Sequence, residues 1–177
     1  MNSNSARTLA RDSAFILERT LPATPGAVWR ALTEPERLNC WWGPKGMPPC
    51  HCNLDLRDGG SFHYGLQMPD GGVMWGRWDI ESVEPEHRLA FLSMFSDENG
   101  GGPTRHPWEP DWPLLMWTEI GFGPAREGTR LAITWIPVDA TVGEIRRFER
   151  GHEECRVGWT GTLDQLEDFL MQEERST

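Results

Sequence analysis

Apolar residues recur every three or four positions near the C-terminal end of the chain and every second position before it. The stretch 141–171 has the helical spacing, and its apolar residues are Val142, Ile145, Phe148, Cys155, Trp159, Leu163, Leu166 and Leu170. This spacing places the side chains along one face of a helix. Thr141 and Glu144 have the spacing of a capping box, which predicts the first turn. We therefore expect one long helix over 141–171 with a buried face.

The middle of this helical stretch contains the glycines Gly151, Gly158 and Gly161, and also His152. Each glycine lowers helix stability by about 1 kcal/mol relative to alanine. The glycines therefore indicate a bend, a close approach of another element, or space left open beside the helix. His152 lies on the face expected to meet the rest of the protein. It is either a buried histidine with a hydrogen-bond partner or an acid or base, because its ordinary pKa of about 6.5 allows both protonation states.

Alternation of apolar and polar residues predicts strands in the preceding part of the chain. The expected strands span residues 13–21, 50–56, 62–66, 74–80, 88–95, 114–122 and 129–136. Thr24-Pro25 is typical of a helix start, and Thr33-Glu34-Pro35-Glu36 has the spacing of a capping box, which together predict two short helices after the first strand. An antiparallel sheet with one apolar face needs a cover, and the long helix can provide it.

The order of these elements predicts an α+β fold, with a curved antiparallel sheet of about seven strands around the long C-terminal helix. At 177 residues the chain is long enough for one core and short for two domains. We expect a single domain over residues 13–171, a loose tail over 1–12 and a short tail over 172–177. Residues 96–113 form an inserted loop that is longer than ordinary hairpin connections.

The same order carries sequence motifs of a known family. They are Leu32-Thr33-Glu34-Pro35, Trp41-Trp42-Gly43-Pro44, Leu56-Arg57-Asp58-Gly59-Gly60, and Gly158-Trp159 followed by Leu163. With these motifs the chain resembles the activator homologues of the heat-shock protein 90 ATPase, within the START-like (SRPBCC) helix-grip superfamily that includes lipid-transfer domains and polyketide cyclases. The resemblance covers residues 13–171 and implies the helix-grip fold. It implies no shared catalytic triad, and nothing in the chain corresponds to the additional domain that the eukaryotic co-chaperone needs for its activity.

Charge and composition narrow the classes of partner. A formal net charge of -10 and a pI near 4.9 argue against nucleic acid or an anionic membrane as the main partner, because both repel acidic proteins. The sequence has no run of about 18 apolar residues and no signal-like start, so we expect a cytoplasmic protein without membrane insertion. Ten tryptophans are unusual for one domain, and large aromatic side chains fill cores or line ligand sites.

We expect neither a metal nor a cofactor. Cys40, Cys50, His51 and Cys52 are residue types that bind zinc, but alternation along a strand turns His51 away from Cys50 and Cys52. The four cysteines are better interpreted as reduced thiols. The sequence also has no phosphate-binding glycine loop before a helix and no serine in a G-x-S-x-G context.

We expect a cavity between the long helix and the inner face of the sheet. Strand and helix parity place seven side chains around it: Tyr64, Trp78, Phe91, Met116, His152, Cys155 and Trp159. Our preferred hypothesis is that it binds a small apolar or aromatic molecule without a defined catalytic apparatus, so an enzyme is the less favoured interpretation. Two alternatives remain open. One is a polyketide cyclase or hydrolase-like enzyme that uses His152 as acid or base, and the other is a module that binds a chaperone or forms a homodimer.

Residues 96–113 are expected to act as a mobile lid over the mouth of this cavity. The segment contains Trp108 and Trp112, each followed closely by proline, and Gly100–Gly102 as hinges. Burial of a large apolar side chain contributes about 1.5–3 kcal/mol, so both indoles should rest against apolar surface. The alternative is that they cover a core edge or a dimer partner.

Overall fold

Seven antiparallel strands form one sheet in the order β1-β7-β6-β5-β4-β3-β2. The strands are β1 (Phe15–Leu21), β2 (Pro49–Leu54), β3 (Ser61–Gln67), β4 (Val73–Glu84), β5 (Arg88–Phe95), β6 (Leu115–Ala125) and β7 (Gly128–Val138). Strands β2 to β7 follow one another as a meander, and β1 joins the sheet beside β7. The computed structural model describes residues 7–176, and residues 1–6 and 177 lie outside the described part. The predicted antiparallel sheet is confirmed.

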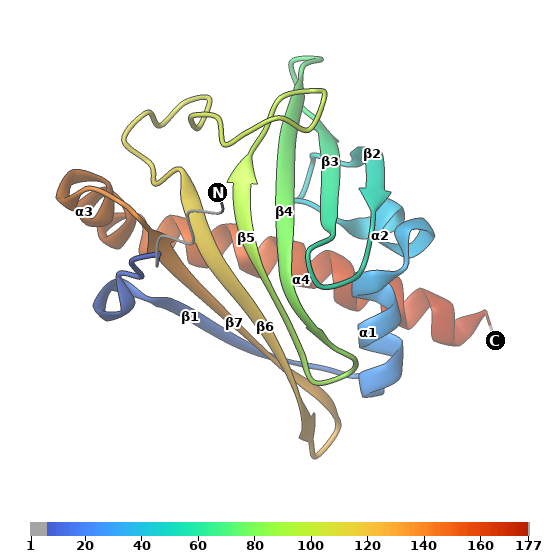
Figure 1. The fold of residues 1–177 in the computed structure, drawn as a ribbon. Coiled ribbons are helices and arrows are strands. Elements are labelled where there is room, and N and C mark those ends of the chain that lie inside the picture. Colours follow the sequence, from blue (N-terminus) through green and yellow to red (C-terminus); the bar gives the residue numbers. More distant parts are fainter. Residues whose placement is uncertain (1–6, 177) are drawn as a thin grey trace.

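A long C-terminal helix covers one face of this sheet. The helices are η1 (Arg11–Ser13), α1 (Pro25–Thr33), α2 (Pro35–Trp41), α3 (Val142–Arg150) and α4 (His152–Arg175). Figure 1 shows α4 crossing behind the sheet, with α1 and α2 near its C-terminal half and α3 at its other end. Arg19 of β1 pairs with Asp164 and Glu167 of α4 at 2.6 Å and 2.5 Å, which fixes the helix against the edge of the sheet. The predicted α+β helix-grip architecture is therefore present.

Gly151 divides the predicted helix over 141–171 into α3 and α4. It has φ -89° and ψ 4°, and its N–H donates to the carbonyls of Arg147 and Phe148. A Cβ here would lie 3.2 Å from the ring of Trp112, so the absence of a side chain permits a close approach. The predicted capping box at the start of α3 is present. Val142, expected on the buried face, is instead 66 % exposed because it is the first residue of α3.

Two groups of buried side chains fill the space between the sheet and the helices. The larger packs the central strands against α1, α2 and the C-terminal half of α4, and it includes Trp41, Phe62, Trp78, Phe91, Leu163 and Leu166. The smaller joins β1, β6, α3 and the start of α4, and it contains Phe15, Trp112, Met116, Phe148 and Cys155. The sheet therefore packs against α4 through two separate groups along the length of the helix.

The N-terminal segment lies against the outer face of the sheet. Leu9 forms an isolated bridge with Val138 and packs on Leu92 and Met94. The backbone N–H of Ala10 donates to a carbonyl of β7 at 3.0 Å. Of the tail expected over residues 1–12, residues 1–6 lie outside the described part, whereas Leu9 and Ala10 are attached to β7.

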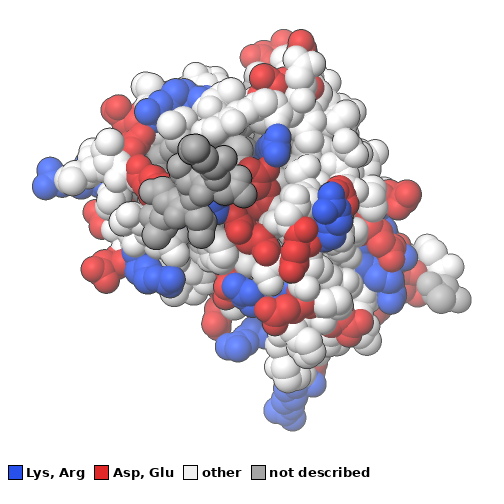
Figure 2. Space-filling model, in the orientation of Figure 1, with Lys and Arg blue, Asp and Glu red and all other residues white. Residues whose placement is uncertain are grey.

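Acidic and basic side chains are intermingled over the face drawn in Figure 2. Several arginines pair with carboxylates across neighbouring elements: Arg88 of β5 lies 3.1 Å from Glu84 and 2.8 Å from Glu119. In these pairs a carboxylate lies next to the basic group and offsets its charge. Among the described residues, no helix combines the length and the apolar character that crossing a membrane requires.

Candidate functional site

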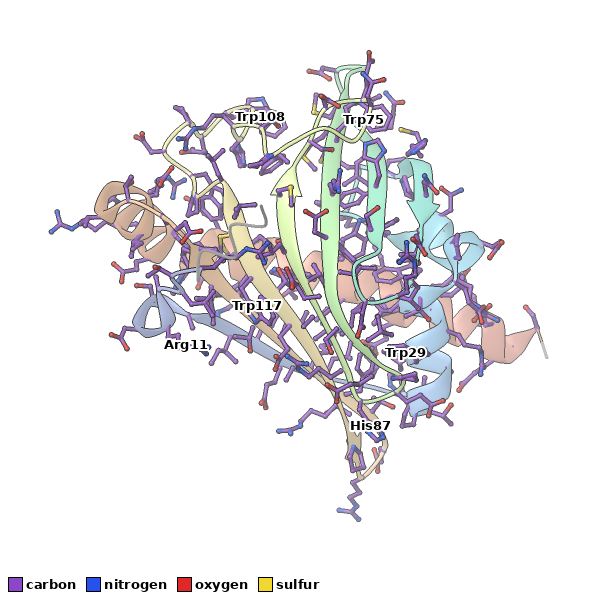
Figure 3. The ribbon with its side chains drawn as sticks, viewed as in Figure 1. Arg11, Trp29, Trp75, His87, Trp108 and Trp117 are labelled. Carbon is purple, nitrogen blue, oxygen red and sulfur yellow. The ribbon has the colours of Figure 1, made fainter. Side chains whose placement is uncertain are left out.

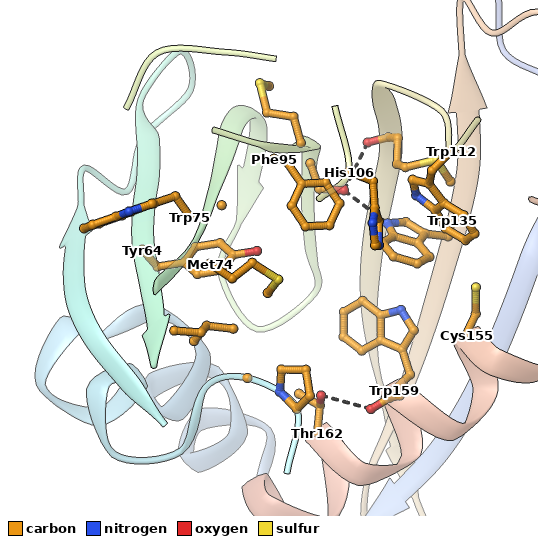
Figure 4. A pocket seen from close by; sticks show the side chains of 18 of the residues that line it. Tyr64, Met74, Trp75, Phe95, His106, Trp112, Trp135, Cys155, Trp159 and Thr162 are labelled. Atoms are coloured by element: carbon orange, nitrogen blue, oxygen red, sulfur yellow. Dashed lines mark hydrogen bonds between the residues drawn. The ribbon is translucent and has the colours of Figure 1, made fainter. Parts of the chain in front are cut away.

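A pocket of about 240 Å³ opens between the inner face of β3–β6 and the N-terminal half of α4. The side chains that enclose it are mostly aromatic or sulfur-containing: Trp42, Tyr64, Met74, Phe95, Trp112, Met116, Trp135, Cys155 and Trp159. Figure 4 shows Tyr64 and Met74 on the sheet side and Trp159 on the α4 side of the same space. Such a concave apolar space is the usual form of a small-molecule site.

Four of the seven side chains predicted to border a cavity lie at this pocket. They are Tyr64, Met116, Cys155 and Trp159. Trp78 and Phe91 do not line it, because they stack on each other with ring centroids 4.0 Å apart in the larger buried group. They share the inner face of the sheet with the pocket residues but lie further along their strands.

His152, the seventh predicted residue, also lies away from the pocket lining. Its ring contacts Phe15 and Phe148 edge-on, with centroids 5.6 Å and 4.8 Å apart. Its Nε2 is buried and has no hydrogen-bond partner. The Ser93 and Thr118 hydroxyls lie 2.9 Å apart and hydrogen-bond each other, not this ring nitrogen. His152 is thus placed in the smaller buried group, not at the pocket.

Tyr64 lies over the backbone of β4 because the residue opposite it is Gly76. A Cβ at Gly76 would lie 2.3 Å from the Tyr64 ring, so only glycine leaves room for the ring in this position. Burial raises the pKa of Tyr64 to about 12, although the neighbouring indoles of Trp78 and Trp42 act in the opposite direction. The phenol is therefore neutral at pH 7, and in Figure 4 its hydroxyl points into the pocket.

Two further titratable groups line the pocket, and both are neutral near pH 7. Burial raises the pKa of the Cys155 thiol to about 11. Burial also lowers the pKa of His106 below its ordinary value, with Glu109 raising it and Arg147 lowering it further. His106 Nδ1 accepts the backbone N–H groups of Trp108 and Glu109, at 3.2 Å and 3.1 Å, so the ring hydrogen of neutral His106 lies on Nε2.

The segment 96–114, between β5 and β6, forms one wall of the pocket. Trp112 is 8 % exposed, lines the pocket and packs edge-on against Phe148 of α3. Trp108, labelled in Figure 3, is 59 % exposed although its ring meets that of His106 edge-on, so the expectation that both indoles rest on apolar surface is wrong for Trp108. Of the two indoles, Trp112 therefore contributes to the lining of the pocket and Trp108 does not.

Ion pairs attach the segment 96–114 to α3. Arg105 pairs with Glu144, the capping-box residue of α3. Arg147 of α3 pairs with Glu109 at 2.9 Å, and its guanidinium lies 5.6 Å from the Trp112 ring centroid. Burial raises the pKa of Glu144, but hydrogen bonds from Arg105 and Thr141 outweigh burial and leave this pKa below its ordinary value. The segment and α3 therefore form one connected wall of the pocket.

The residues weighed as metal ligands do not converge. His51 packs against His63 and Trp75 on the outer face of the sheet, with ring centroids 4.9 Å and 5.4 Å away. Cys52 packs on the inner side against the larger buried group, as strand alternation predicts. Cys50 is exposed where the register of β2 shifts. Within residues 7–176, no three His, Cys, Asp or Glu side chains come together in an arrangement that could hold a metal ion.

The sequence interpretation missed several pocket residues: Trp42, Met74, Phe95, His106 and Trp135. Met74 and Phe95 share the inner-face parity of Trp78 and Phe91, so alternation identifies their face but not their height along the strands. Trp42 is the C-cap of α2. It is followed by Gly43-Pro44, a pair that is typical of the end of a helix. His106 lies in a segment without periodicity, where no sequence signal placed it.

Comparison with known proteins assigns the chain to a family. The family model described as activator of Hsp90 ATPase homolog 1-like protein matches residues 22–171. The chain belongs to this family. The resemblance inferred from the sequence motifs is thereby confirmed, while no curated protein matches the chain.

Solved structures of bacterial proteins share the fold of this chain. A protein from Nitrosomonas europaea is 30% identical with a TM-score of 0.71, and the match covers 92% of this chain and 96% of that chain. A protein from Mycobacterium smegmatis is 24% identical with a TM-score of 0.72, covering 94% and 96%. A protein from Arthrobacter aurescens is 21% identical with a TM-score of 0.74, covering 93% and 91%. At such identities the last two support the fold alone.

Proposed function

We propose that the protein binds a small apolar or aromatic molecule in the pocket between the sheet and α4. The observation that carries this proposal is a pocket of about 240 Å³ enclosed by tryptophan, tyrosine, phenylalanine and methionine side chains. The apolar side chains around the open space are not fully buried, so part of the free energy of burial is lost. A ligand of matching apolar character would bury these surfaces and recover that free energy. The segment 96–114, through Trp112, acts in this proposal as a lid that closes over the ligand.

The arrangement favours binding without catalysis. The lining has nucleophile types in Ser93, Thr162 and Cys155, but the Ser93 hydroxyl is hydrogen-bonded to Thr118 and to the Trp135 indole, and the Thr162 hydroxyl donates to the Gly158 carbonyl. Cys155 is a neutral thiol because burial raises its pKa to about 11, and the Nδ1 of His106 is occupied by two backbone N–H groups. His152, the candidate acid or base, lies outside the lining. Among the described residues, the exposed large apolar side chains are spread over β1, the segment 96–114, α3 and α4. This distribution does not favour one element as the binding surface for a protein partner.

Two helix glycines offer a matched test of this proposal. A Cβ at Gly158 would meet no heavy atom within 4 Å, and at Gly161 only the Cβ of Lys45 at 4.0 Å, but only Gly158 lines the pocket. Both positions therefore accept a side chain, and Gly158→Phe narrows the pocket whereas Gly161→Phe does not. The uncharged fluorescent probe N-phenyl-1-naphthylamine would report binding.

Gly158→Phe is expected to lower the affinity of the probe by about tenfold or more, which corresponds to about 1.4 kcal/mol. Gly161→Phe should bind the probe as the unmodified protein does, and circular dichroism would verify the fold of both variants. Equal affinity in all three proteins, or equal losses in both variants, would place the probe elsewhere and contradict the proposal. Native mass spectrometry of freshly purified protein would show whether a small molecule co-purifies.

A further inference from the structure

We propose that the ligand is uncharged and carries a hydrogen-bond acceptor oxygen, such as a carbonyl, which the Tyr64 hydroxyl binds. This inference rests on the proposed function and specifies the chemistry of its ligand. It comes from two features of the pocket. One is the absence of charge in its lining, and the other is a hydroxyl hydrogen that has no acceptor.

The lining of the pocket contains no Asp, Glu, Lys or Arg among its 21 residues. Its titratable members are Tyr64, His106 and Cys155, and burial keeps each of them in the neutral form at pH 7. A charged ligand would lose its hydration here without gaining an opposite charge, which is unfavourable by several kcal/mol in an apolar site. The lining therefore selects against carboxylates, phosphates and amines.

The Tyr64 hydroxyl has donors beside it but no acceptor. The rings of Trp42 and Trp78 lie edge-on to the Tyr64 ring, with centroids 5.7 Å and 6.3 Å away, and an indole N–H only donates hydrogen bonds. Trp42 Nε1 is buried and has no hydrogen-bond partner, so it is a second unused donor near Tyr64. Among the described residues, none accepts the hydrogen of the Tyr64 hydroxyl. Because the hydroxyl points into the pocket, its free hydrogen is available to a ligand (Figure 4).

The other hydroxyls of the lining are already occupied. The Ser93 oxygen receives the Trp135 indole N–H at 3.1 Å and lies 2.9 Å from the Thr118 hydroxyl. The Thr162 hydroxyl donates to the Gly158 carbonyl at 3.1 Å. His106 keeps one ring N–H, on Nε2, because its Nδ1 is an acceptor. The available groups are thus donors, which match a ligand that accepts hydrogen bonds.

Three molecules with one tricyclic frame would test the proposal: 9-fluorenone has a carbonyl acceptor, fluorene has none, and fluorene-9-carboxylate carries a negative charge. Their affinities would be measured by displacement of N-phenyl-1-naphthylamine. We expect 9-fluorenone to bind about fivefold to tenfold more tightly than fluorene, the contribution of one hydrogen bond. Fluorene-9-carboxylate should bind more weakly than both.

Tyr64→Phe keeps the ring over Gly76 and removes only the hydroxyl, so it should abolish the preference for 9-fluorenone while leaving fluorene affinity unchanged. Ser93→Ala is the matched control, because it removes a lining hydroxyl that is already occupied and should preserve the preference. A preference that survives Tyr64→Phe, or tight binding of the carboxylate, would overturn this inference. Failure of N-phenyl-1-naphthylamine itself to bind would overturn the proposed function as well.

Discussion

The interface between the sheet and α4 has two halves that use the same aromatic residue types but pack them differently. In the packed half, defined by Trp41, Phe62, Trp78, Phe91 and Leu166, Trp78 and Phe91 are stacked and at most 2 % exposed. In the open half, defined by the pocket lining, Trp135 and Trp159 meet edge-on with centroids 5.8 Å apart and stay partly exposed. Aromatic content alone therefore does not determine where a pocket forms.

The open half differs in where side chains are missing. Gly76 replaces a side chain on the inner face of β4, and the Tyr64 ring occupies the space above it. Gly158 leaves open space on the pocket side of α4. In the packed half, Leu163 and Leu166 of α4 are at most 3 % exposed against the sheet. The pocket thus lies where Gly158 leaves space beside α4, next to a Tyr64 ring that fits over β4 because residue 76 is glycine.

The largest effect is expected from truncating the packed half. Trp78→Ala removes a side chain that is 2 % exposed and should lower the free energy of unfolding by about 3–5 kcal/mol. Trp159→Ala, on the pocket wall, should lower it by less than half as much because that indole is already partly exposed. At about 2–4 °C per kcal/mol, thermal denaturation followed by circular dichroism would separate the two variants clearly.

Probe affinity, measured for the same two variants, should change in the opposite order. Trp159→Ala should weaken binding of N-phenyl-1-naphthylamine, whereas Trp78→Ala, assayed well below its melting temperature, should retain it. Equal losses of stability in the two variants would show that the two halves are packed alike and would remove the basis of the comparison.

The sequence predicted the face of each side chain better than its position along the sheet. Alternation correctly turned Phe62, Tyr64 and Trp78 toward the helix, because the period of two is a local property of a strand. Whether an inner residue meets α4 or the pocket depends on where the helix crosses the strands, which is a tertiary property. Trp78 of β4 lies diagonally across from Tyr64 of β3, with ring centroids 6.3 Å apart, yet Trp78 is core and Tyr64 lines the pocket.

The break between α3 and α4 shows the same limit. The sequence contains Gly151 and indicated a bend, a close approach or open space without choosing among them. The structure shows a close approach, because Trp112 from a segment without periodicity packs where a Cβ would be. The capping box at Thr141 and Glu144 was predictable because both partners lie within one turn, whereas the pairing of Glu144 with Arg105 was not.

A smaller effect is expected from the ion pair that attaches the pocket wall to α3. Glu144→Gln keeps a capping-box residue type but removes the charge that pairs with Arg105. The folded-state pKa of Glu144 is lowered, so its contribution to stability is present above the unfolded pKa of about 4.3 and is lost as pH falls through the lower folded value. Between pH 7 and acidic pH, Glu144→Gln should therefore lose less stability than the unmodified protein.

Arg105 is half exposed, so we expect this difference to be at most about 1 kcal/mol in urea unfolding measured across that pH range. At pH 7, trypsin should cleave after Arg105 faster in Glu144→Gln, because the side chain is no longer held. Glu109→Gln, which also weakens the attachment to α3 but leaves Arg105 paired, is the control. Unchanged cleavage at Arg105 would indicate that the pair with Glu144 does not hold the wall, and that Trp112 and the Arg147–Glu109 pair are sufficient.

The smallest effect on stability and on probe affinity is expected at His152, which packs outside the pocket. Its Nε2 is buried without a partner, and its ring contacts Phe15 and Phe148 edge-on. His152→Leu keeps apolar contacts and removes the unpaired polar atom, so stability should change by no more than about 1 kcal/mol and probe affinity should stay the same. His152→Asn, which keeps a polar group but loses the ring, should be less stable than His152→Leu in urea unfolding. If His152→Leu instead weakened probe binding while leaving stability intact, His152 would belong to the site, and its role as acid or base would need to be tested.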